Sequence, residues 1–224
     1  MSVTETNGVQ QFFLSPTFAA YISSTGRCSP AREFCALSMA ELEEVVTALL
    51  KPSRVPHVLG CRDTAIALAR LWGADEVDAG RAGLLHDITK ALDGPCQLTL
   101  AEEYGIILDE FSQKNPKTLH ALTGSLVAKW VFEENEAVVQ AIRHHTTGKA
   151  DMNLLEKIIY VADYMEPNRD FPGVEKLREL AYTDLDAALK LGLEMTLELL
   201  NKQGSEVSPE SREALAWLNR KGKM

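Results

Sequence analysis

The chain has few of the features that mark nucleic-acid-binding or membrane proteins. Its 224 residues include 23 Lys and Arg against 32 Asp and Glu, so the formal net charge is −9. Because nucleic-acid binders normally carry a basic patch, duplex DNA or RNA is not expected as a partner. No apolar run approaches the roughly 18–20 residues of a membrane span, and the N-terminal MSVTETNGVQQ lacks the basic and apolar parts of a signal peptide. We therefore expect a cytoplasmic protein that is not bound to membranes.

Metal-binding or redox cysteine pairs are also missing. Cys28, Cys35, Cys61 and Cys96 contain no C-x-x-C pair, which argues against a zinc ribbon or a thioredoxin-like site. We expect free thiols, with Cys61 and Cys35 helical and buried.

Strand-like alternation of aromatic and β-branched residues is nearly absent, whereas apolar residues recur every three or four positions from Met39 onward. This spacing is typical of amphipathic helices and predicts an all-α helical bundle. The predicted helices cover 38–50, 56–72, 75–86, 97–104, 117–133, 136–145, 153–165, 173–180, 184–203 and 208–220. Ser38 followed by Glu41 resembles a capping box.

The two ends of the chain differ from the predicted domain at 38–205. Residues 1–37 form an appendage, rich in Ser, Thr, Gly and Pro, whose LSPTFAAYISSTG resembles the C-terminal tail of nicotinate mononucleotide adenylyltransferases. The segment is interpreted either as a remnant of such a fused tail or as an extra helix packed on the bundle. Residues 206–224 form a C-terminal helix that could pack on the bundle or mediate a homodimer.

Four of the five histidines stand where an apolar residue is expected on the core face of a helix: His57, His86, His120 and His145. A buried imidazole must find a hydrogen-bond partner or coordinate a metal. A single such histidine is more often a satisfied core residue, but four would each need a separate buried partner.

Two carboxylates extend this group. Asp87 directly follows His86, and Asp163 lies at core phase in the apolar LLEKIIYVADYM, where an unpaired charge would be costly. Imidazoles and carboxylates together bind zinc, iron or manganese. The sequence therefore predicts a metal site.

These residues also carry a resemblance to a known family. His57, the doublet His86-Asp87 placed 29 residues later in AGLLHDITK, and Asp163 reproduce the H…HD…D signature of HD-domain metal phosphohydrolases. The later RHHTTG and ADYMEPNRDFPGV resemble the bacterial HD-domain bis(5′-nucleosyl)-tetraphosphatases (symmetrical), which cleave diadenosine tetraphosphate into two ADP. His144 stands where the family usually has Tyr.

The resemblance implies an HD-domain fold and a set of metal ligands. His57, His86, Asp87 and Asp163 would hold a divalent transition metal, most often iron in this family, with manganese as an alternative. His120 and His145 would either complete a second metal site that shares Asp87 or contact phosphate. Both alternatives, and hence one or two ions, stay open.

It also implies residues that bind the substrate, a dinucleoside polyphosphate, and its product, ADP. Arg54 matches a phosphate contact, and Arg169, Phe171, Pro172 and Gly173 match the part of the site that holds the terminal nucleotide.

Two further residues follow from the chemistry of phosphate transfer. Lys90, one turn after His86, would contact a phosphate oxygen as negative charge develops, and is predicted to be catalytic together with Asp87. Thr146 would donate a hydroxyl to phosphate. The alternatives are a solvated lysine at a helix end, a loop cap at Thr146, and for Arg169 an ion pair with Asp170 or Glu166.

The predicted function is symmetrical hydrolysis of diadenosine tetraphosphate. Two alternatives remain: an HD phosphatase acting on mononucleotides or deoxynucleotides, and a nucleotide-sensing module that has lost turnover. Retention of His57, His86, Asp87 and Asp163 argues against the sensing module.

Overall fold

The computed structural model describes residues 14–28 and 34–221, and these ranges contain helices and loops without strands. The α-helices are α2 (Pro16–Thr25), α3 (Met39–Leu49), α4 (Val55–Trp72), α5 (Glu76–Leu85), α6 (Gly94–Glu103), α7 (Glu110–Lys114), α8 (Leu119–Trp130), α9 (Glu136–His144), α10 (Leu154–Met165), α11 (Val174–Ala181), α12 (Leu185–Lys202) and α13 (Pro209–Lys221). Two short 3₁₀ helices, η1 (Pro52–Arg54) and η2 (Pro116–Thr118), precede α4 and α8. The all-α prediction is confirmed.

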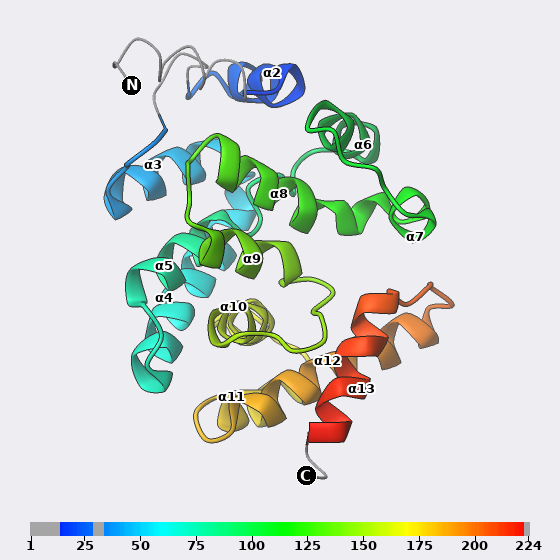
Figure 1. The fold of residues 1–224 in the computed structure, drawn as a ribbon. Helices are drawn as coiled ribbons and strands as arrows, with labels where there is room; N and C mark the ends of the chain where they lie inside the picture. The colour runs from blue at the N-terminus through cyan, green and yellow to red at the C-terminus, as the bar shows by residue number, and fades with distance from the viewer. Residues whose placement is uncertain (1–13, 29–33, 222–224) are drawn as a thin grey trace.

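Helix α10 lies at the centre of the bundle and packs against α4, α5, α9, α11 and α12 (Figure 1). Its start is fixed by a capping box, in which Asn153 and Glu156 satisfy each other's backbone N–H groups. Ile158, Ile159 and Ala162 are fully buried. The apolar run that surrounds Asp163 in the sequence is therefore the central helix of the core.

Helices α4 and α5 pack more closely than ordinary side chains allow. A Cβ atom added to Gly83 of α5 would lie 2.7 Å from the Cα of Arg62 on α4. Only a residue without a side chain permits this approach. The contact brings the first turn of α4, which carries His57, next to the end of α5, which is followed by His86.

All ten helices predicted from residue spacing are present, with some different bounds. The capping box of Ser38 and Glu41 is confirmed. Helix α6 begins three residues before the predicted position 97, because the Asp93 carboxylate accepts from the backbone N–H of Cys96 and Pro95 occupies the first turn. Helices α2 and α7 were not among the predicted ranges.

The cysteine prediction holds only in part. All four cysteines are free, and Cys61 is buried in α4. Cys35 lies in a turn and is half-buried, so the expectation of a buried helical residue is wrong for this position.

The end segments share the core of the bundle. Helix α2 packs on α6 and α3, and its Phe18 and Ile22 are fully buried. Helix α13 packs on α12 through Ala214 and Leu218, at the opposite end of the molecule in Figure 1. The packed extra helix expected as one alternative for residues 1–37 is thus present at 16–25, while the resemblance to an adenylyltransferase tail stays a prediction. Within the described ranges, no helix combines the length and the apolarity of a membrane span.

Candidate active site

Six side chains from five parts of the fold converge at one end of α10. His57 comes from the first turn of α4, and His86 and Asp87 directly follow α5. His120 lies in the first turn of α8, His145 directly follows α9, and Asp163 lies in the last turn of α10. Subsets of three among them have ligand atoms within 4.8 Å of one another. The structure brings together all the residues predicted as metal ligands.

Four of these side chains form a first group around one point. The Nε2 atom of His57 lies 3.3 Å from Nε2 of His86, 3.1 Å from Oδ1 of Asp163 and 3.7 Å from Oδ2 of Asp87. The Nε2 atom of His86 lies 3.5 Å from the same Asp87 oxygen. Ligand atoms about 2.1 Å from one ion stand roughly 3–4 Å apart. The Nε2 atoms of His57 and His86 therefore have the separations, from each other and from both carboxylates, that a shared divalent ion requires.

A second group uses the other oxygen of Asp87. Its Oδ1 atom lies 3.4 Å from Nε2 of His120 and 3.7 Å from Nε2 of His145, and these two nitrogens are 3.1 Å apart. Oδ1 is buried and accepts no hydrogen bond from any residue that the structure describes, and the nearest protein cation, the Lys90 ammonium, lies 3.7 Å from it. A buried carboxylate oxygen without a donor is unfavourable unless a cation satisfies it. This orphaned atom fits a metal bound between Asp87, His120 and His145.

The opposite nitrogen of each histidine is held by the protein. The Nδ1 atoms of three rings lie 2.7–2.8 Å from the backbone carbonyls of Gly83, Lys117 and Ile142, for His86, His120 and His145 respectively. The Nδ1 atom of His57 lies 3.1 Å from Oε1 of Glu166. A proton on Nδ1 leaves the Nε2 lone pair free, so each ring is oriented to donate that lone pair into the cluster.

The electrostatic environment favours the metal-binding protonation states of Asp87, Asp163 and His120, but not of His86: although burial alone would lower it, Cys61 and Asp87 hold the pKa of His86 well above its usual range. Burial alone would raise the pKa of the Asp87 carboxyl, but the charge of His86 and contact with His145 hold that pKa well below its usual range. Burial opposes ionisation of Asp163 in the same way, yet His57, His86 and Arg169 keep its pKa well below normal. Burial and the neighbouring Lys90 and His145 lower the pKa of His120 to about 3. Ionised carboxylates and neutral imidazoles are the metal-binding forms.

Three cations and a hydroxyl surround the cluster. Arg54 donates to Oδ2 of Asp87, with its Nε at 2.7 Å, and Arg169 donates to Oδ1 of Asp163 at 2.7 Å. The Nζ atom of Lys90 lies 2.8 Å from Nε2 of His120. The Thr146 hydroxyl lies 3.1 Å from the Nε2 atoms of both His120 and His145. Thus Lys90 contacts the cluster although its side chain is also 40% exposed to solvent, and Arg169 pairs with Asp163, not with Asp170 or Glu166.

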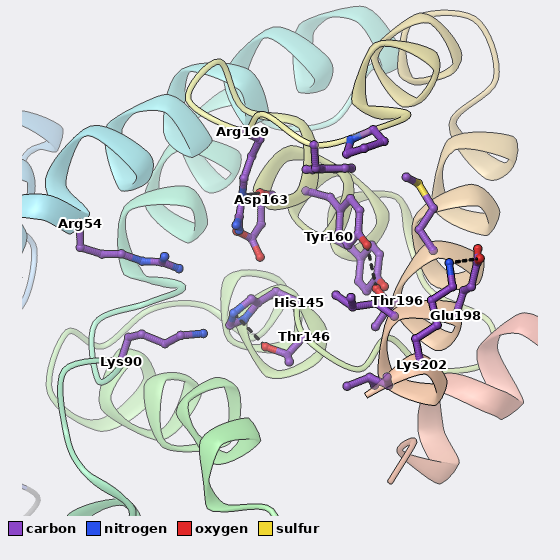
Figure 2. A pocket seen from close by; sticks show the side chains of 16 residues that line it. Arg54, Lys90, His145, Thr146, Tyr160, Asp163, Arg169, Thr196, Glu198 and Lys202 are labelled. Carbon is purple, nitrogen blue, oxygen red and sulfur yellow. Dashed lines mark hydrogen bonds and ion pairs between the residues drawn. The ribbon is translucent and has the colours of Figure 1, made fainter. Parts of the chain in front are cut away.

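A cavity of about 720 Å³ opens beside the cluster. Figure 2 shows Arg54 and Lys90 reaching in from one side, Arg169 and Asp163 next to His145, and Glu198 and Lys202 at the far side. Phe171 and Pro172 line this cavity, as expected for a nucleotide site.

Gly173 does not line the cavity. This glycine has φ +95° at the N-terminus of α11, and its Cα packs so close to Met195 that a Cβ would lie 2.9 Å from the methionine Cε. Its observed role is to let α11 pack close to α12, and its contact with substrate stays a prediction.

Glu166 is a site residue that the sequence did not single out. It is 1% exposed, and besides His57 it binds Asn168, whose backbone N–H and side-chain amide donate to Oε2 at 2.7 and 2.8 Å. Gly60 permits this arrangement, because a Cβ there would lie 2.4 Å from Oε2. A carboxylate that orients a ligating histidine is a common partner in metal sites. The signal available in the sequence was only an acid near Asp163.

We expect Glu166→Gln to weaken metal binding about 10–100-fold, which is the usual effect of losing such a partner. The amide would lose the charge opposite His57 and place an N–H₂ group against the two Asn168 donors. Chelator competition on the purified protein measures the affinity. Asp170→Asn, a carboxyl-to-amide change at an exposed position of the same loop, is the control; equal affinity in both variants would show that Glu166 does not position His57.

His144, the departure from the family pattern, lies outside the cluster. Its Nδ1 atom lies 3.1 Å from the buried carboxylate of Glu156 and 3.0 Å from the carbonyl of Gln140. These contacts link α9 to the start of α10.

Comparison with known proteins agrees with this geometry. The HD-domain family model matches residues 54–168, about half of the chain. The chain is 42% identical over 174 residues to the symmetrical bis(5′-nucleosyl)-tetraphosphatase of Halalkalibacterium halodurans, covering 75% of this chain and 90% of that protein. Identity to the Bacillus subtilis protein of the same name is 40% over 173 residues, covering 75% and 91%. The chain belongs to this family of HD-domain tetraphosphatases.

A solved structure supports the same fold for this chain. The crystal structure of a predicted HD superfamily hydrolase involved in NAD metabolism, from Clostridium acetobutylicum, is similar with a TM-score of 0.80 at 36% identity, covering 83% of this chain and 98% of that one. The HD match contains all six candidate ligands and ends before α11 and α12. Part of the cavity wall therefore comes from beyond the matched segment, namely from α12 and from the loop that holds Phe171 and Pro172.

Proposed function

We propose that this chain hydrolyses diadenosine tetraphosphate symmetrically, giving two ADP. The observation that carries the proposal is the position of the His and Asp cluster, which lies at the wall of a cavity lined by Arg54, Lys90 and Arg169. A cation-lined cavity next to a metal site is suited to phosphoanhydride hydrolysis. The family membership selects the dinucleoside tetraphosphate among phosphate substrates.

The residues present fit one or two divalent ions. His57, His86, Asp87 and Asp163 would hold the first, and Asp87, His120 and His145 the second, with iron as the proposed ion and manganese as an alternative. A bound ion supplies an acidified water and polarises the phosphoryl group. Imidazole nitrogens and carboxylates are ligands that iron and manganese accept.

The side chains around the cluster are placed to bind phosphate oxygens and to neutralise the charge on the leaving phosphate. Arg54 and Arg169 each contact a ligand carboxylate and face the cavity, so they are placed to hold phosphate oxygens beside the cluster. Burial and the nearby Arg54 and Arg169 lower the pKa of Lys90. Its ammonium is placed to neutralise charge on the leaving phosphate, and Thr146 to donate a hydroxyl to a phosphate oxygen.

The products of diadenosine tetraphosphate test this proposal. We expect ADP as the main product, loss of turnover after chelation, and recovery when iron or manganese is added back. AMP with ATP as products would contradict symmetrical cleavage. Faster hydrolysis of mononucleotides would favour the HD phosphatase alternative, and absence of turnover with metal bound would favour the sensing module. A cytoplasmic location and a homodimer remain predictions.

A further inference from the structure

Two cavities of different character meet at the site. The large cavity of about 720 Å³ and a smaller one of about 200 Å³ both have Arg54 and Lys90 in their walls. Arg54 contacts Asp87 directly, and Lys90 contacts His120. The boundary between the two cavities therefore lies at the candidate metal ligands, where the scissile bond of a substrate would be.

The far end of the large cavity is aromatic and apolar. Tyr164 meets Phe171 edge-on with ring centroids 5.4 Å apart and stacks on Tyr160 at 6.2 Å. Helix α12 supplies Met195 and Leu199, and the Thr196 hydroxyl donates to Tyr164 at 3.2 Å. In Figure 2, Arg54 lies on one side of Asp163 and Arg169, and this aromatic end of the cavity lies on the other side. Aromatic and apolar walls with a few hydroxyls are typical of base-binding sites.

The small cavity has no comparable surface. Its walls are Leu50, Lys51, Ser53, Arg54, Lys90 and Ala91, which include no aromatic residue. Lys51 and Ser53 are exposed, and the Lys51 ammonium makes no ion pair with any residue in the described ranges. This surface offers positive charge for phosphate and nothing on which a base would stack.

We propose that the two halves of the substrate bind unequally. One nucleoside diphosphate places its base between α10 and α12, and the other lies over Lys51 and Ser53, where no side chain recognises its base. The proposal rests on the proposed function. Cleavage at the junction of the two cavities yields one nucleoside diphosphate from each side. Two identical products thus arise from an asymmetric complex, and one wall of the base site, α12, lies outside the segment that matches the HD-domain model.

Substrates with one or two purines test this arrangement. Because a pyrimidine stacks over less area, diuridine tetraphosphate should have kcat/KM at least about 10-fold below that of diadenosine tetraphosphate. The mixed adenosine–uridine tetraphosphate can always place its adenine in the aromatic cavity. Its kcat/KM should be about half that of diadenosine tetraphosphate, since only one of two orientations is productive. The proposal would be overturned if kcat/KM of the mixed substrate lay midway, on a logarithmic scale, between the kcat/KM values of diadenosine and diuridine tetraphosphate.

Two substitutions separate the cavities. Leu199 is 54% exposed and lines the aromatic end, so Leu199→Asp should leave folding intact, raise KM for diadenosine tetraphosphate about 10-fold and remove the preference over diuridine tetraphosphate. Leu71→Asp is the matched control, because Leu71 is 51% exposed and lies on α4 outside both cavities. Lys51→Ala should lower kcat/KM for all three substrates by the same factor. A changed base preference in Lys51→Ala, or an unchanged one in Leu199→Asp, would contradict the assignment.

Binding of the products keeps this test independent of turnover. ADP should bind the metal-loaded protein about 10-fold more tightly than UDP, and Leu199→Asp should abolish that difference. Equal affinity for ADP and UDP in the unaltered protein would overturn the base site. Failure to form ADP from diadenosine tetraphosphate would instead refute the proposed function while the binding result still decides the base site.

Discussion

Asp87→Asn is expected to reduce kcat/KM for diadenosine tetraphosphate by more than about 100-fold. Asp87 is the one candidate ligand whose two oxygens face the two groups of imidazoles, at 3.4–3.7 Å on each side. The amide is nearly the same size but neutral, and its nitrogen cannot donate a lone pair to an ion. Loss of a residue that merely orients a ligand costs about 10–100-fold, so loss of a shared ligand should cost more.

Measured metal content should fall together with turnover, while the helical circular dichroism signal is retained. Asp63→Asn, at an exposed position of α4, is a control for the same chemical change away from the site. Full metal content with normal turnover in Asp87→Asn would remove the shared-ligand assignment. An unfolded variant would instead indicate that the carboxylate stabilises the fold through Arg54, and His120→Gln, which leaves Asp87 in place, would then test the second group by metal content.

The candidate ligands could be predicted because each breaks a pattern locally. His57, His120 and Asp163 are polar residues on otherwise apolar helix faces, and that conflict can be read within one helix. The helices themselves follow from three- and four-residue spacing and from caps such as that of Ser38. In both cases the information lies within about ten residues of the position concerned.

The parts that were missed depend on packing between distant segments. Glu166 binds His57, which is 109 residues away in the sequence, and no local pattern identifies that pairing. Met195 and Leu199 continue the apolar stripe of α12 and resemble ordinary core residues, yet they line the cavity. Gly173 belongs to the same motif as Phe171 and Pro172 but begins α11 and does not line the cavity, so its contact with substrate stays a prediction.

Gly83→Ala is expected to destabilise the fold and the site together. The new Cβ would lie 2.7 Å from the Cα and 3.1 Å from the backbone N of Arg62, atoms that cannot move without shifting α4. Overpacking of this kind costs about 1–3 kcal/mol or more, which exceeds the gain of up to about 1 kcal/mol in helix propensity. The Gly83 carbonyl also lies 2.7 Å from Nδ1 of His86. Separating α4 from α5 would therefore widen the 3.3 Å spacing between the Nε2 atoms of His57 and His86.

Gly80→Ala on the same helix distinguishes this effect from a general cost of replacing glycine. Its Cβ would meet the Cε of Met39 at 2.8 Å and the Cδ1 of Ile66 at 3.1 Å, which are the ends of flexible side chains. We expect its unfolding free energy to change by less than about 1 kcal/mol, because the helix propensity gained offsets a small rearrangement. Thermal unfolding and metal content measure both variants. Equal stability and metal content would show that the separation of α4 and α5 is not what sets the His57–His86 geometry, because only the Gly83 substitution forces the two helix backbones apart.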